Sequence, residues 1–263
     1  MELSLILFRI ALLCYGLGFL LILIPLLGGG RRAVRITPWL AGAGAIAHTA
    51  AMVALSLTLG RCPVETLPEV LSALAWVAVL VYLAAWARYR LEVLHLIILP
   101  LVLITMVVSK ILPAEIVPLS EGMRPTFLRF HLTSIILGVA ALFITFAASL
   151  IYVLVDRSLK SKRSPRFSLS LPSLHRSDAI ARLSLMWAFP LLTIGIFTGA
   201  VVNAAETGTY WSWNSRETLS VIAWVILAIV VVARVGWGWR GRKAAILTIL
   251  GFAAVLLRML GIA

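Results

Sequence analysis

Eight long apolar stretches constrain the fold of this chain more than any other feature of its sequence. Most run for about 18–25 residues with few charges, which is the length that an α-helix needs to cross a bilayer. Strands that cross a membrane would instead show segments of about ten residues in which apolar and polar side chains alternate. The sequence therefore predicts an all-α polytopic membrane protein. The expected spans are 4–27, 38–59, 70–87, 91–112, 128–155, 183–203, 218–235 and 244–261.

Composition and charge narrow the class further. With 62% hydrophobic and 13% charged residues, the chain differs from a soluble globular protein, whose apolar share is about 45–50%. We relate the net charge of +13 to membrane topology and expect no nucleic-acid partner. Only Cys14 and Cys62 occur, which gives neither a disulfide framework nor a zinc pattern. The sequence has no nucleotide-binding loop, acyl-transfer constellation or carboxylate pair suited to hydrolysis, so we expect no independent enzymatic activity.

Lys and Arg residues lie mostly on one set of alternate loops between the expected spans. Sixteen of the 23 fall on that set and seven on the other. Because cytoplasmic loops carry the excess of basic residues, the first set should be cytoplasmic. Segment 156–182 would then be a basic cytoplasmic loop, while both termini and segment 204–217 would lie on the outer side. The first apolar run lacks a basic start and a cleavage site, so we interpret it as a retained helix.

An aromatic and polar run separates the sixth and seventh expected spans. It carries Tyr210, Trp211 and Trp213, followed by Asn214 and Arg216. Such side chains can stack on a flat apolar ligand and hydrogen-bond to its polar edge. They are also typical of the aromatic belt at the interface of any membrane protein. The residues alone leave both interpretations open.

Few titratable side chains lie in or near the spans, which makes each of them informative. His131, at the outer start of the fifth span, could ligate iron or hydrogen-bond to a lipid headgroup. His48, near the middle of the second span, could be a ligand or could form an interhelical hydrogen bond. Arg129 and Arg258 lie at outer-leaflet depth, where each could snorkel to the interface or pair with an anionic ligand.

The run from Gly208 to Thr218 resembles the tryptophan-rich WWD signature of the cytochrome c assembly membrane proteins. This family includes CcsA-, CcmC- and HemX-type proteins. The basic turn 236–245 and the segments 48–76 and 131–160 are similar to the same family, so nearly the whole chain is covered.

Several positions depart from the pattern of this family. Asn214 replaces the Asp of the signature, and Val232 stands where synthase-like members have a membrane histidine. No histidine follows the last expected span. Together with the compact length, these departures indicate the HemX-type branch.

The resemblance implies a single assembly-type domain over residues 1–263, in the bacterial inner (cytoplasmic) membrane. It implies haem as the cofactor, bound or presented on the outer face over segment 204–217, with His131 as the ligand of the iron. The candidate haem contacts are His131, Tyr210, Trp211, Trp213, Asn214, Arg216, Arg129, Arg258 and His48.

The partners implied are haem, membrane lipid and other proteins of cytochrome c assembly or haem biosynthesis. The alternative is a non-catalytic, HemX-like regulator of haem biosynthesis, or a scaffold subunit of a membrane complex, that has lost haem ligation.

Overall fold

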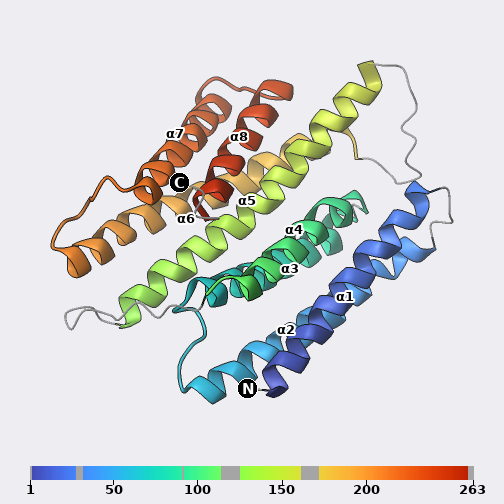
Figure 1. Ribbon diagram of the computed structural model, residues 1–263. Helices are drawn as coiled ribbons and strands as arrows, with labels where there is room; N and C mark the ends of the chain where they lie inside the picture. The colour runs from blue at the N-terminus through green and yellow to red at the C-terminus, as the bar shows by residue number, and fades with distance from the viewer. Residues whose placement is uncertain (1, 28–31, 91, 114–124, 161–171, 260–263) are drawn as a thin grey trace. The chain divides into compact units, whose positions relative to one another are not determined.

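The computed structural model describes residues 2–27, 32–90, 92–113, 125–160 and 172–259. Within these ranges the chain forms eight α-helices, one short 3-10 helix η1 (Ala33–Arg35) and no strand, which confirms the prediction of an all-α fold (Figure 1). The helices are α1 (Glu2–Leu26), α2 (Thr37–Leu59), α3 (Leu67–Tyr89), α4 (Val93–Ile111), α5 (Pro125–Lys160), α6 (Leu174–Thr207), α7 (Ser215–Gly236) and α8 (Arg242–Met259).

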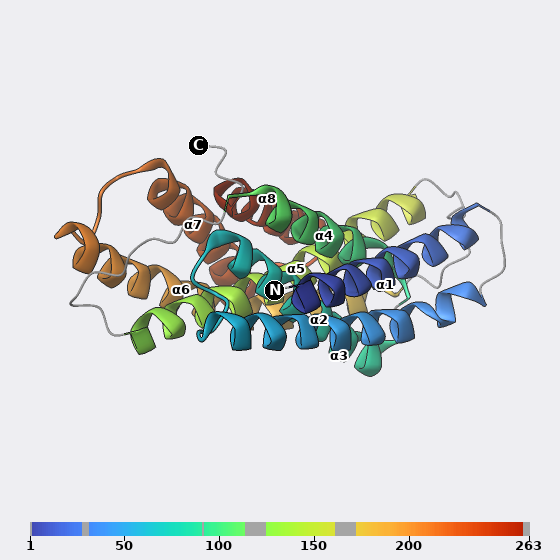
Figure 2. The same ribbon diagram turned by 60° about the horizontal axis from the view of Figure 1, so that its bottom comes forward.

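The helices form two compact units, with α1 to α4 in the first and α5 to α8 in the second. In the first unit α1 packs against α2 and α4, and α3 packs against the same two helices; α1 lies beside α2 in both orientations (Figures 1 and 2). In the second unit α5 and α7 each pack against α6 and α8. Because each helix contacts its neighbours in the chain and the last contacts the first, each unit has the contact pattern of an up-and-down four-helix bundle. The expectation of one assembly-type domain over the whole chain stays a prediction.

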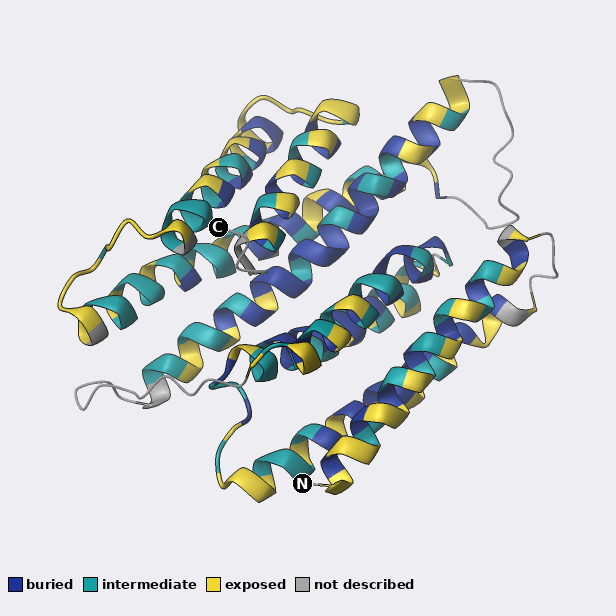
Figure 3. Ribbon diagram, viewed as in Figure 1, coloured by how far each residue is buried: buried dark blue, intermediate teal, exposed yellow. Residues whose placement is uncertain are grey.

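Seven of the described helices, α1 to α7, are long and apolar enough to cross a membrane. The eighth helix, α8, is not among these seven, and the eighth expected span, 244–261, stays a prediction. Large apolar side chains such as Leu3 and Leu13 are exposed along α1, as expected for a helix that faces lipid (Figure 3). The chain is therefore a multi-pass membrane protein, and the side on which its termini lie stays a prediction.

Helices continue through polar residues at both ends of segment 156–182, which stays a prediction as a cytoplasmic segment. Helix α5 runs to Lys160, whose Nζ pairs with Asp156 one turn earlier at 2.9 Å. Helix α6 begins at Leu174, and the Ser173 hydroxyl caps it by accepting a hydrogen bond from the backbone N–H of Arg176. Residues 161–171 of the predicted loop lie outside the described residues.

Helical structure also extends into both ends of the predicted outer segment 204–217. Helix α6 continues to Thr207 and ends where Gly208 adopts a left-handed conformation with φ of 76°. Helix α7 begins directly after Asn214, which is its N-cap. The connection is therefore residues 208–214, which we call the tryptophan loop.

Two glycines allow α5 and α6 to approach each other closely. A Cβ atom on Gly195 would lie 2.7 Å from Cγ1 of Ile135, and one on Gly138 would lie 3.0 Å from Cγ of Leu192. Among the described residues of the second unit, helix α5 carries more buried side chains than any other helix (Figure 3). The close contact places side chains near the start of α5 directly against the end of α6 that precedes the tryptophan loop.

Candidate functional site

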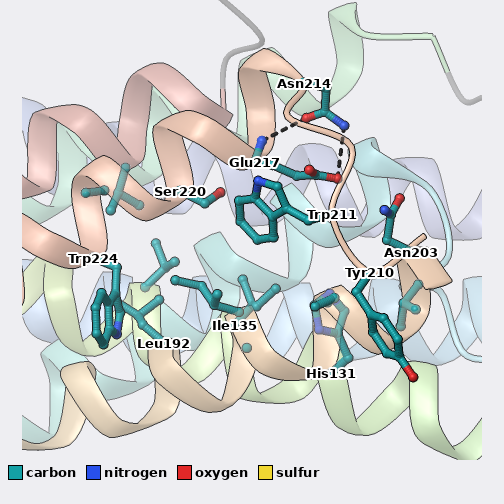
Figure 4. Close-up of a pocket in the computed structure, with 18 residues that line it drawn as sticks. His131, Ile135, Leu192, Asn203, Tyr210, Trp211, Asn214, Glu217, Ser220 and Trp224 are labelled. Atoms are coloured by element: carbon teal, nitrogen blue, oxygen red, sulfur yellow. Dashed lines mark hydrogen bonds between the residues drawn. The ribbon is translucent and has the colours of Figure 1, made fainter.

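A cavity of about 350 Å³ lies in the second unit, lined by α5, α6, α7, one residue of α8 and the tryptophan loop (Figure 4). In Figure 4, Trp224 lies at one end, while His131 and Tyr210 lie toward the other. Apolar walls with a few polar groups are typical of small-molecule and cofactor sites. The lining residues are His131, Ile135, Val139, Leu192, Gly195, Ile196, Gly199, Ala200, Val202, Asn203, Tyr210, Trp211, Asn214, Glu217, Ser220, Ala223, Trp224 and Val255.

His131, on the first turns of α5, reaches this cavity against the facing surface of α6. Its Nδ1 lies 2.8 Å from the hydroxyl oxygen of Thr198. The hydroxyl of Thr198 also donates to the backbone carbonyl of Ile194, one turn earlier in α6, at 2.6 Å. The imidazole fits here because α6 has a glycine beside it: a Cβ atom on Gly199 would lie 3.0 Å from Cε1 of His131.

The tryptophan loop is fastened to the end of α6 by one amide side chain. Asn203, on the last turns of that helix, donates from Nδ2 to the carbonyl of Thr209 at 2.8 Å and to the hydroxyl of Ser212 at 2.9 Å. The positive φ of Gly208 turns the chain back so that these contacts can form. The loop is therefore a defined structure rather than a free connection.

The same loop is fastened to the start of α7 by Asn214 and Glu217. The side-chain oxygen of Asn214 accepts from the backbone N–H of Glu217 at 2.8 Å, which caps the helix. Its amide nitrogen donates to Glu217 Oε1 at 3.1 Å (Figure 4). The backbone N–H of Ser212 donates to Glu217 Oε2 at 2.7 Å. Both polar atoms of Asn214 thus serve the loop itself, and the Glu217 carboxylate lies in the first turn of α7, where the helix dipole stabilises it.

The three aromatic side chains of the loop have different surroundings. Tyr210 and Trp211 line the cavity. Trp213 is not among the lining residues; it is 79% exposed, and its ring meets that of Trp211 in a T-shaped contact with centroids 6.0 Å apart. The backbone of Trp213 is left-handed, with φ of 54°, which costs a non-glycine residue about 1–3 kcal/mol.

The structure brings together only part of the predicted set. His48 belongs to the first unit, where it lines a different cavity of about 290 Å³ and its Nε2 lies 3.0 Å from the hydroxyl oxygen of Ser72. Arg129 is exposed on α5 two residues before His131 and does not line the 350 Å³ cavity. The side chains of Arg216 and Arg258 lie outside the described part of the chain.

Several residues of the cavity were not predicted from the sequence. Asn203, Ser220 and Trp224 line it from helices that the sequence predicts as membrane spans, and Thr198, which does not line it, contacts His131 from α6. One signal was present: Gly195 and Gly199 are spaced by four residues, which puts two small residues on one helix face where a neighbour can approach. That spacing did not reveal which residue would approach, because this depends on how α5 and α6 pack.

The fold and this cavity define a multi-pass helical membrane protein in which an aromatic loop and a single histidine meet at one site in the second unit. Comparison with known proteins identifies the class. The chain belongs to the cytochrome c assembly protein family, whose match covers residues 64–263. The prediction of this family is thereby confirmed.

Individual relatives carry names from the same process. The chain is 31% identical over 212 residues to the cytochrome c biogenesis protein CcsA of Chlamydomonas reinhardtii, which covers 77% of this chain and 58% of that protein. It is 30% identical to CcsA of Microcystis aeruginosa, with 93% of this chain and 90% of the relative covered.

The fold resembles that of a solved structure. Cytochrome c haem lyase CcmF matches with a TM-score of 0.75 and 18% identity, covering 98% of this chain and 46% of that one. The chain thus spans less than two thirds of the length of CcmF and of the Chlamydomonas relative, and the likeness to CcmF is one of fold.

Proposed function

We propose that this chain handles haem in cytochrome c assembly, holding or presenting it at the cavity of the second unit. One observation carries the proposal: His131 and the tryptophan loop, which are far apart in the sequence, line the same cavity. The names of the relatives support it, since they are cytochrome c biogenesis proteins, and the structure of similar fold is a cytochrome c haem lyase.

The residues present fit a haem. A neutral imidazole is the usual axial ligand of haem iron, and His131 supplies one at the cavity. Apolar walls and the rings of Tyr210 and Trp211 suit a flat apolar macrocycle. The described residues contain no group of three His, Cys, Asp or Glu that could hold a metal ion, but a haem iron takes most of its ligands from the porphyrin.

Each residue of the site then has a role. His131 would hold the iron, Tyr210 and Trp211 would contact the ring, and Trp213 would extend the aromatic surface through Trp211. Asn214 acts indirectly, because its hydrogen bonds to Glu217 hold the loop in place. Bound haem supplies an iron centre and two propionates, and the proposed cationic partners of the propionates are Arg129, Arg216 and Arg258. His48 is left out of the proposed haem contacts because it lines the cavity of the first unit.

We further propose that the tryptophan loop and both termini lie on the outer side of a bacterial inner membrane. The excess of Lys and Arg on the opposite loops supports this orientation. In this proposal the tryptophan loop is a WWD-type signature, and the chain belongs to the HemX-type branch of the family. The protein presents haem to other assembly proteins and does not itself catalyse a reaction.

The test is an absorption experiment with a matched control. The protein is purified in detergent, haem is added, and oxidised and reduced Soret bands are recorded for wild type, His131→Ala and His175→Ala. His175 is an exposed histidine on the first turn of α6 and does not line the cavity, so its variant should behave as wild type. Loss of the band with His131→Ala alone supports the proposal, while a wild-type protein that gives no Soret band on haem addition contradicts it.

A second candidate function is a HemX-like regulator of haem biosynthesis, or a scaffold subunit, that no longer ligates haem. It is favoured by one observation: His131 is the only histidine among the described residues that line the cavity. Such a protein would act through its basic residues at the ends of α5 and α6. Co-purification of a cytoplasmic partner that survives His131→Ala but is lost on neutralising Arg157, Lys160 and Arg176 supports this alternative.

A further inference from the structure

We propose that Thr198 is a positioning residue for the iron ligand, because it fixes the neutral tautomer of His131. This inference rests on the proposed function for the role of His131, while the tautomer itself is a property of the protein alone. Thr198 lies on α6, does not line the cavity, and meets His131 across the α5–α6 contact.

The tautomer follows from counting protons around one oxygen. The Thr198 hydroxyl has a single proton, and Oγ1 lies 2.6 Å from the carbonyl oxygen of Ile194 and 3.2 Å from that of Gly195. Carbonyl oxygens only accept, and two oxygens 2.6 Å apart repel unless a proton lies between them, so we assign the hydroxyl proton to the contact with the carbonyl of Ile194. Oγ1 is then an acceptor toward His131 Nδ1 at 2.8 Å, and Nδ1 must carry the proton of the neutral ring. The lone pair that can bind a metal is therefore on Nε2.

A second contact restrains the ring in the same orientation. Gly199 follows Thr198 in α6, and a Cβ atom at this position would lie 3.0 Å from Cε1 of His131. The imidazole edge thus lies against the backbone of α6, beside the hydroxyl that accepts from Nδ1. Thr198 and Gly199 together set both the direction of the ring and the nitrogen that carries its proton.

Removing the hydrogen-bond partner of a metal-ligating histidine weakens the affinity for the metal. A hydrogen bond from the distal nitrogen of a ligating histidine fixes its tautomer and makes it a stronger base, and loss of the partner typically weakens affinity by about 10–100-fold. Thr198→Val keeps the shape of the side chain and removes the hydroxyl, so it should weaken haem binding by about 10–100-fold. Thr198→Ser keeps the hydroxyl and should restore binding to near the wild-type value.

The experiment measures the tautomer without haem and the affinity with it. The chain has 4 histidines, so NMR of protein labelled with nitrogen-15 in histidine, with His131→Gln to assign the signal, reports which ring nitrogen of His131 is protonated. Haem affinity is measured in parallel by Soret titration. Thr133→Val is the matched control, because its hydroxyl likewise donates to a carbonyl one turn earlier, that of Arg129 at 2.7 Å, but it is exposed on α5 and does not line the cavity.

The inference is supported if His131 of the wild type is protonated at Nδ1, if Thr198→Val changes this signal and weakens haem binding, and if Thr198→Ser and Thr133→Val do neither. Protonation at Nε2 in the wild type overturns it. If the Soret band requires His131 but Thr198→Val does not change haem affinity, the inference about Thr198 is also overturned, although the proposed function then stands. A Soret band that does not depend on His131 overturns the proposed ligand and with it the role of Thr198, whatever tautomer the NMR signal reports.

Discussion

Replacing Asp178 with alanine is expected to destabilise the second unit by about 3–5 kcal/mol, because it leaves a buried cation without its counter-charge. The side chain of Arg234 on α7 is 0% exposed, and its Nη1 donates to Oδ1 of Asp178 on α6 at 3.0 Å. The described residues offer the Nε and Nη2 atoms of Arg234 no hydrogen-bond partner. The same carboxylate oxygen accepts from the backbone N–H of Gly241, in the turn before α8, at 3.4 Å. Asp178 therefore ties α6 to α7 and to the α7–α8 turn.

Asp156 provides a matched comparison at the end of α5. Its carboxylate pairs with Lys160 at 2.9 Å and lies 3.9 Å from Arg242, but these two cations are 63% and 43% exposed. Water can solvate them once the carboxylate is gone, so Asp156→Ala should cost only about 0–1 kcal/mol. The two variants remove the same chemical group and differ mainly in the burial of the cation left behind.

The free energy of unfolding would be measured in mixed micelles by titration with SDS, followed by tryptophan fluorescence. The double variant Asp178→Leu with Arg234→Leu replaces the pair by apolar side chains and should recover most of the loss, since such replacements are close to neutral. Equal losses for Asp178→Ala and Asp156→Ala would refute the reasoning. A double variant as unstable as Asp178→Ala would refute it as well.

Three further predictions concern the site and its orientation. Asn214→Ala removes the N-cap of α7 and should cost about 1 kcal/mol of stability, measured by the same SDS titration, whereas Asn214→Ser, which keeps a capping oxygen, should cost less. Gly199→Ala should displace the imidazole of His131 and weaken haem binding in a Soret titration, because the added Cβ would stand 3.0 Å from Cε1; unchanged binding would contradict the contact. Cys62, exposed between α2 and α3, should react in intact cells with a membrane-impermeant thiol reagent in a Cys14→Ser background, and labelling only after lysis would reverse the proposed orientation.

The helices could be predicted from the sequence because the residues that lie in the hydrocarbon core of a membrane must be apolar. The ends of the helices could not be predicted in this way. A run of apolar residues shows where a helix crosses hydrocarbon and gives no information once the chain leaves it. Helix α6 starts well before its apolar part, because Ser173 caps it and polar residues continue its turns, and it extends as far as Thr207. Single side chains, such as the capping Ser173, determine where these helices begin and end, and mean hydropathy over a long apolar run does not detect them.

The candidate site was predictable in its chemistry and less so in its geometry. His131, Tyr210 and Trp211 were identified as residue types that suit a flat, iron-containing ligand, and the structure places all three at one cavity. The hydroxyl of Thr198 could not be assigned to His131, since that contact depends on the packing of α5 against α6. The left-handed backbone of Trp213 could not be foreseen either, because bulky residues rarely adopt this conformation.

Ser212, which lies between Trp211 and Trp213, connects the tryptophan loop to both α6 and α7. Its hydroxyl is held by Asn203 of α6, and its backbone N–H is held by Glu217 of α7. A separation of the two helices at this end must therefore break one bond or the other, and whichever helix keeps Ser212 carries Trp211 and Trp213 with it. The position of Trp211, which lines the cavity, is therefore tied to the spacing between the ends of α6 and α7.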